Sequence, residues 1–94
     1  MSYNAMDTQF PILTMYYAPW CPHSQEAMSV WNELQQTLLG SQITTKKVDA
    51  VETPDLVPPF VRAFPTIVLS KNGRNLEYQG RRTLDNLLSF IQYN

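Results

Sequence analysis

The chain has 94 residues, of which 44% are hydrophobic, a formal net charge of −1 and a single cysteine. This length gives one domain with one modest core, and the small net charge argues against an electrostatic nucleic-acid binder. One cysteine excludes an internal disulfide, and with one histidine it cannot supply the three or four protein ligands of an ordinary zinc site.

Residues 1–10 are mostly polar and aperiodic, so we expect a flexible leader before a domain that spans residues 11–94. The N-terminus lacks a basic stretch followed by an apolar one, and no run approaches ~18 apolar residues. Neither a signal peptide nor a membrane span is therefore expected. The sequence favours a cytoplasmic monomer that has no membrane contact.

The first strand and the first helix are predicted on either side of the cysteine. Residues 10–17 form a nearly continuous apolar run, which favours a central strand covered on both faces. Residues 22–39 predict an amphipathic helix, because apolar residues, among them Trp31 and Leu34, recur at helical spacing. Gly40 supplies the usual left-handed stop. We expect Trp31 to lie in the core.

A second strand and a proline-rich segment are predicted next. Residues 43–48 predict a strand parallel to the first, because a helix joins the two. Thr53 and Pro54 form a suitable start for a helix, but further prolines interrupt the segment up to residue 65. Only one or two short turns are expected there, with a helical piece over residues 60–63.

The C-terminal part predicts a hairpin followed by a helix. Strands over residues 66–70 and 75–79 flank Asn72-Gly73, the strongest short hairpin signal in the sequence. Thr83 is a good N-cap for a last helix, which carries an apolar stripe up to Ile91. The predicted order is β-α-β-α-β-β-α, an α/β domain with a four-stranded mixed sheet.

The single cysteine lies where the first strand should give way to the first helix. Pro22 suits the first helical position, which places Cys21 at or beside the N-cap. Amides of the first turn, those of His23 and Ser24, then point toward its sulfur, and the helix dipole favours thiolate over thiol. We expect a pKa below the ~8.5 of free cysteine. The alternative is an inert buried cysteine, although prolines, a histidine and a serine make poor core neighbours.

Residues around this cysteine resemble a known active site. The run from Tyr17 to Ser24, Tyr-Ala-Pro-Trp-Cys-Pro-His-Ser, resembles the active-site turn of the thioredoxin superfamily, and residues 17–21 are similar to catalytic domains of protein disulfide isomerases. Further landmarks agree in order and rough spacing: Lys47-Val48-Asp49-Ala50, residues 61–67, Asn72-Gly73 and residues 78–83. The resemblance implies a minimal thioredoxin fold of glutaredoxin size, without the extra N-terminal strand and helix of full thioredoxins.

The resemblance also assigns roles at the thiol. It implies that Cys21 is the catalytic nucleophile and that Ser24 stands where Cys-x-x-Cys proteins have a resolving cysteine. The Ser24 hydroxyl cannot attack a mixed disulfide, but it can donate to the sulfur. His23 either stabilises the thiolate or is a solvated residue of the first turn. Arg62, similar to an arginine before the family's cis-proline loop, either modulates the thiol pKa or is simply solvated.

A substrate surface is implied opposite the thiol. The resemblance implies a cis bond before Pro65, with the backbone of Phe64 beside the cysteine and open to strand-like hydrogen bonds with an extended substrate. The implied substrate-binding residues are Trp20, Pro22, Phe64, Pro65 and Thr66.

Three functions fit a lone reactive thiol. The first is a thiol-disulfide oxidoreductase, a natural monothiol or one engineered to trap substrates, which acts on a disulfide-containing protein or on glutathione without cofactor or metal. The second is an iron–sulfur carrier like monothiol glutaredoxins, with Cys21 and glutathione as ligands in a dimer. Pro22 and His23 depart from the Cys-Gly-Phe-Ser favoured there. The third is a non-catalytic module that holds clients through a disulfide.

Overall fold

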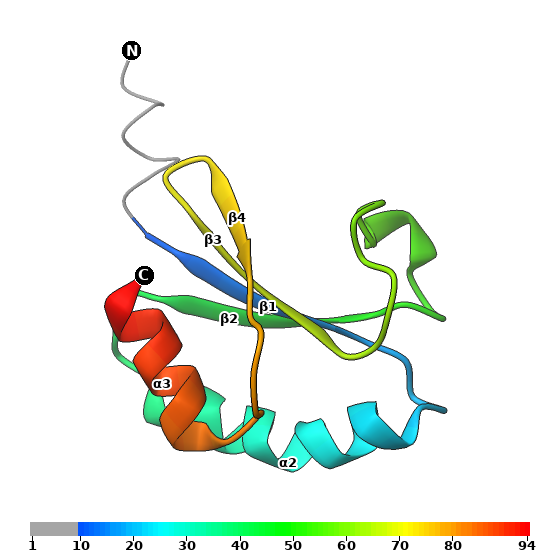
Figure 1. The fold of residues 1–94 in the computed structure, drawn as a ribbon, viewed down its shortest axis with the longest axis horizontal. Helices are drawn as coiled ribbons and strands as arrows, with labels where there is room; N and C mark the ends of the chain where they lie inside the picture. Colours follow the sequence, from blue (N-terminus) through cyan, green and yellow to red (C-terminus); the bar gives the residue numbers. More distant parts are fainter. Residues whose placement is uncertain (1–9) are drawn as a thin grey trace.

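The computed structural model describes residues 10–94, so the predicted leader lies outside the described residues except for Phe10, which is exposed. The elements are β1 Ile12–Tyr17, α2 Pro22–Thr37, β2 Thr44–Asp49, the 3-10 helix η1 Pro54–Leu56, β3 Thr66–Lys71, β4 Arg74–Glu77 and α3 Leu84–Tyr93. The sheet order is β2-β1-β3-β4. Strand β1 runs parallel to β2 and antiparallel to β3, which confirms the predicted mixed sheet (Figure 1).

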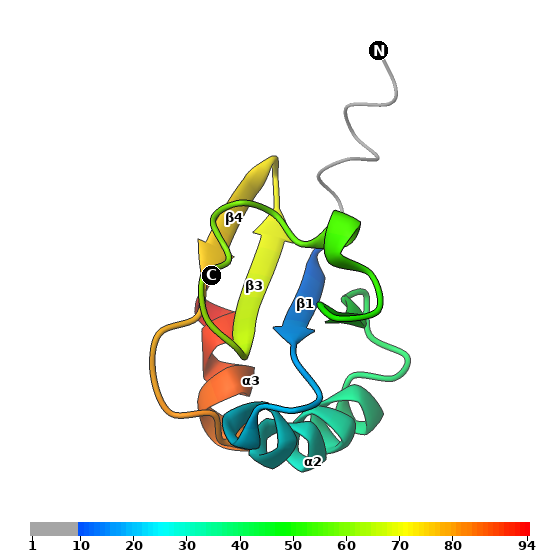
Figure 2. The same cartoon turned by 90° about the vertical axis from the view of Figure 1, so that its right-hand side faces the viewer.

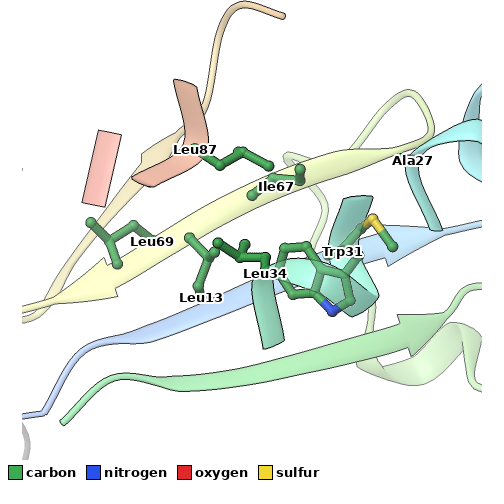
Figure 3. Packing of buried hydrophobic residues seen from close by; sticks show 8 residues of the cluster. Leu13, Ala27, Trp31, Leu34, Ile67, Leu69 and Leu87 are labelled. Carbon is green, nitrogen blue, oxygen red and sulfur yellow. The ribbon is translucent and has the colours of Figure 1, made fainter. Parts of the chain in front are cut away.

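The core lies between the sheet and its two helices. Both α2 and α3 cover the same face of the sheet, as the two ribbon views show (Figure 1, Figure 2). Alternate residues of β1 and β3 point toward them, because side chains of a strand alternate between its two faces. The buried cluster consists of Leu13, Met15, Ile67 and Leu69 from the sheet, Ala27, Trp31 and Leu34 from α2, and Leu87 from α3 (Figure 3).

The two central strands are buried most deeply. Leu13, Thr14 and Met15 of β1 are buried in succession, as are the first four residues of β3. A strand buried on successive residues is covered on both faces, which explains the continuous apolar run that predicted β1. The carboxyl ends of β1 and β2 and the beginning of β3 meet at one end of the sheet (Figure 1).

The segment between β2 and β3 differs from the prediction. Its helical structure is the short η1, and the helical piece expected over residues 60–63 is absent from the structure. The prediction is wrong because only four residues lie between Pro59 and Phe64. Phe64 precedes Pro65 and is therefore kept out of the helical region, and a single isolated helical turn is costly to form. Thr53 precedes η1, but its hydroxyl donates to the carbonyl oxygen of Asp49 (2.9 Å) and does not cap the helix.

Turns and caps follow the local sequence closely. Asn72 and Gly73 have φ values of 55° and 73°, as a two-residue hairpin of the I′ type requires. Gly40 has a φ of 83°, although α2 ends earlier, at Thr37. The Thr83 hydroxyl accepts a hydrogen bond from the Asn86 amide (3.1 Å) and caps α3 as predicted. Within residues 10–94, no helix has both the length and the apolar character needed to cross a membrane.

Candidate active site

The cysteine occupies the N-cap of α2. Cys21 has φ −87° and ψ 122°, and Pro22 takes the first helical position. The Cys21 amide donates to the carbonyl oxygen of Ala18 (3.0 Å), which closes the turn that leads from β1 into the helix. Cys21 is partly exposed and forms no disulfide. Its sulfur is therefore accessible at the positive end of a 16-residue helix.

The start of the helix lowers the pKa of the Cys21 thiol. The main cause is the backbone amide of Ser24. Partial burial opposes the shift, and the His23 amide, the Ser24 hydroxyl and the positive charge of Arg82 add to it. The side chain of Cys21 makes no capping hydrogen bond of conventional geometry, so these groups act by directing positive charge at the sulfur. The thiolate is the form that attacks disulfides, so the arrangement favours the reactive species.

Ser24 links the sulfur to the turn before it. Its side chain is 1% exposed, and its oxygen accepts a hydrogen bond from the Ala18 amide (3.2 Å). The same hydroxyl lowers the pKa of Cys21. A hydroxyl can accept one hydrogen bond and donate another, so Ser24 serves both the backbone and the thiolate.

A distant segment lies beside the thiol. In its protonated form, Sγ of Cys21 donates to the carbonyl oxygen of Phe64 (3.5 Å), and the Phe64–Pro65 peptide bond is cis. The neighbouring Thr66 is buried, and its hydroxyl donates to the carbonyl oxygen of Ala63 (2.6 Å). The structure thus brings the segment before β3 to the cysteine, where the resemblance had placed it.

The other predicted site residues are exposed on the surface. Trp20 is 67% exposed, and Pro22 and His23 are also exposed. Arg62 is exposed too, and it is not among the groups that shift the Cys21 pKa. The role proposed for Arg62 therefore stays a prediction.

Sequence reasoning missed Arg82 as a partner of the thiol. It lies in the segment between β4 and α3, which reaches the N-terminal half of α2 (Figure 2). Nothing in the local sequence indicates this role, because only the fold brings that segment to the first turns of α2. The family resemblance includes residues 78–83 but assigns Arg82 no function.

Two hollows flank the first turns of α2. One, of about 350 Å³, is mainly apolar, and the other, of about 190 Å³, is mainly polar. Their helix residues fall on opposite sides of α2, since each residue turns the helix by about 100°. The apolar hollow is lined by Tyr17, Pro19, Ser24, Gln25 and Met28, and the polar one by His23, Glu26, Ala27 and Arg82.

Metal binding by the described chain would need outside ligands. Within residues 10–94, no three side chains of His, Cys, Asp or Glu lie together where they could hold an ion. An iron–sulfur cluster on Cys21 would accordingly take its other ligands from glutathione and a second chain, as that alternative already requires.

The reactivity of the thiol should extend to lower pH than that of ordinary cysteine. A lowered pKa means that the thiolate forms at lower pH, so the rate of alkylation by iodoacetamide should reach half its plateau below the pH seen for the same chain in denaturant. Ser24→Ala removes one donor and should raise this midpoint part of the way. Ser29→Ala, an exposed change on the same helix, should leave it unchanged. A native midpoint equal to the denatured one would contradict the electrostatic account.

Comparisons with known proteins identify the family. The thioredoxin family model matches residues 3–93. The chain is 37% identical over 81 residues to protein disulfide-isomerase TMX3 of Homo sapiens, and 37% identical over 93 residues to a protein disulfide-isomerase of Saccharomyces cerevisiae. These alignments cover 83% and 94% of this chain but only 18% of each relative. The first thioredoxin domain of mouse protein disulfide-isomerase A4 superposes with a TM-score of 0.78, at 27% identity, over 98% of this chain and 67% of that one. The chain belongs to the thioredoxin family.

Proposed function

We propose that the chain carries out thiol–disulfide exchange through Cys21 as a monothiol. The observation that carries the proposal is an accessible sulfur at the start of α2 whose pKa is lowered by amides, a hydroxyl and Arg82. The family membership supports it, and two relatives that share 37% of matched residues are named protein disulfide-isomerases. Ser24 restricts the chemistry to steps that need one sulfur.

Each exchange step conserves electrons. The Cys21 thiolate attacks one sulfur of a substrate disulfide, a new S–S bond forms, and the second substrate sulfur leaves as a thiolate. An external thiol such as glutathione then attacks the substrate sulfur of the mixed disulfide and releases Cys21. Ser24 cannot perform this second step, because a hydroxyl does not displace a thiolate from a disulfide. The cycle therefore supports glutathione-dependent reduction and disulfide reshuffling.

Substrate would lie across the surface formed by the active-site turn and the segment before β3. The Phe64 carbonyl already approaches Sγ of Cys21 (3.5 Å), so backbone hydrogen bonds to an extended substrate would place its disulfide near the thiolate. Trp20 and Pro22, the two sequence neighbours of Cys21, are exposed and add apolar surface to this site. We propose a shallow site in which backbone contacts contribute more than deep side-chain pockets.

Oxidised glutathione provides the direct test. Incubation should add one glutathione per chain, as measured by intact mass, and reduced glutathione should remove it. Cys21→Ser should remain unmodified, with an unchanged circular dichroism spectrum as evidence of folding. An unmodified native chain would contradict the proposal. A mixed disulfide between Cys21 and a peptide that reduced glutathione does not release would favour the client-holding module.

A further inference from the structure

The polar hollow beside α2 contains an arginine without a carboxylate partner. It is lined by His23, Glu26, Ala27 and Arg82 and has a volume of about 190 Å³. Arg82 is exposed, and across residues 10–94 no carboxylate lies within ion-pair distance of its guanidinium. Its five N–H donors form a planar fork that matches a carboxylate. The hollow thus offers an unused anion-binding group.

The hollow contains one positive and one negative side chain, and they have different neighbours. Arg82 is close enough to Cys21 for its charge to act on the thiol. Glu26 lies beside His23 instead, with its Oε1 3.8 Å from the Nδ1 of His23. An anion that entered the hollow would be attracted by Arg82 and repelled by Glu26. The two residues should therefore affect the binding of an anion in opposite directions.

We propose that Arg82 binds a carboxylate carried next to the substrate's reacting sulfur, so that the chain prefers disulfides with an acidic neighbour. This inference rests on the proposed exchange at Cys21. Arg82 would contact substrate directly and act as a specificity-determining residue. Two sources offer this chemistry: an acidic residue beside a client cysteine, and a carboxylate of glutathione.

The position of the hollow explains why the carboxylate must be near the sulfur. Its helix residues belong to the first two turns of α2, directly after Cys21. A substrate whose sulfur is bonded to Cys21 can extend over these turns toward Arg82. On the opposite flank of α2, the hollow at Tyr17, Pro19 and Met28 is mainly apolar and has no charged residue in its lining, and the nearby Nζ of Lys47 contacts Sδ of Met28 (3.7 Å). A client chain would therefore bind with its acidic residue on the Arg82 side of α2.

The test compares disulfide probes of different charge. The probes are 5,5′-dithiobis(2-nitrobenzoate), which carries ring carboxylates, and the neutral dipyridyl disulfide. In both, the Cys21 thiolate forms an S–S bond with one aryl sulfur and the other leaves as aryl thiolate. Rates are divided by the thiolate fraction from alkylation, so that a changed thiol pKa does not enter the comparison. The readout is the ratio of the anionic to the neutral rate.

Substitutions should move this ratio in opposite directions. An exposed charge pair contributes little free energy. Arg82→Gln should therefore lower the ratio of the anionic to the neutral rate about two- to fivefold. Glu26→Gln should raise this ratio by a similar factor. Added salt should weaken both effects. Arg81→Gln and Glu33→Gln, exposed changes of the same type outside the hollow, should leave the ratio unchanged.

A second pair of substrates separates the two sources. Glutathione disulfide is compared with its carboxyl-esterified form, and a peptide disulfide with aspartate beside cysteine is compared with its asparagine analogue. Arg82→Gln should reduce the preference for the acidic member in at least one pair, which identifies the source. If neither pair responds while the neutral probe still reacts, the carboxylate site is wrong. If the neutral probe fails to react with the native chain, exchange at Cys21 itself is wrong.

Discussion

Ser24→Cys is expected to turn the monothiol site into a reversible dithiol–disulfide. Position 24 lies three residues after Cys21 on the first turn of α2, and side chains at this spacing are neighbours on a helix. The Ser24 hydroxyl already acts on the Cys21 sulfur, so a sulfur in its place lies within reach of disulfide geometry. The variant would gain net two-electron oxidation and reduction of substrates, which one thiol cannot perform.

Mass spectrometry in glutathione redox buffers measures this change. The variant should lose two hydrogens on oxidation and carry no stable glutathione, whereas the native chain carries one. Ser29→Cys is the matched control, because it makes the same substitution on an exposed position of the same helix. It should form glutathione adducts and no internal disulfide. Two free thiols in oxidised Ser24→Cys would contradict the placement of these side chains on one turn.

Trp31→Ala is expected to lower the free energy of unfolding by about 3–5 kcal/mol. Trp31 is 1% exposed and fills the space between α2 and the sheet (Figure 3). A loss of this size is a large part of the total stability of a small domain, ~5–15 kcal/mol. Since Cys21 lies at the start of α2, its thiol pKa should return to the ordinary value when the variant unfolds.

Trp31→Phe separates packing from hydrogen bonding. The indole nitrogen of Trp31 is buried and has no hydrogen-bond partner among the described residues, so a phenylalanine loses volume but breaks no hydrogen bond. Its cost in urea unfolding should be clearly smaller than that of Trp31→Ala. Trp20→Ala is the control, because Trp20 is 67% exposed and its loss should cost less than about 0.5 kcal/mol. Equal costs at the two tryptophans would show that Trp31 is not a core residue.

Local signals predicted much of the fold. The apolar run of β1, the helical spacing of Trp31 and Leu34, the Asn72-Gly73 turn and the Thr83 cap each depend on residues close in sequence. Boundaries shifted by one or two residues because helix and strand ends depend on packing as well as propensity. The N-cap position of Cys21 was also predictable from a local signal, because Pro22 fixes the start of α2.

Long-range contacts were less accessible to sequence reasoning. The approach of Phe64 to Cys21 was expected only through the family resemblance, because the two residues are 43 positions apart. Arg82 was missed because its effect arises from the packing of the segment before α3 against α2. The helical piece at residues 60–63 was predicted wrongly, since the prolines around it outweigh the helical preference of its members.

The amides at the start of α2 also determine how easily a covalent complex is undone. Ser24 and His23 stabilise the Cys21 thiolate through their N–H groups, and a thiolate of low basicity departs faster when another thiol attacks the sulfur bound to it. Cys21 is therefore a good leaving group for the same reason that it ionises readily. A captured client would be released quickly wherever reduced thiols are abundant, and would stay attached where they are scarce.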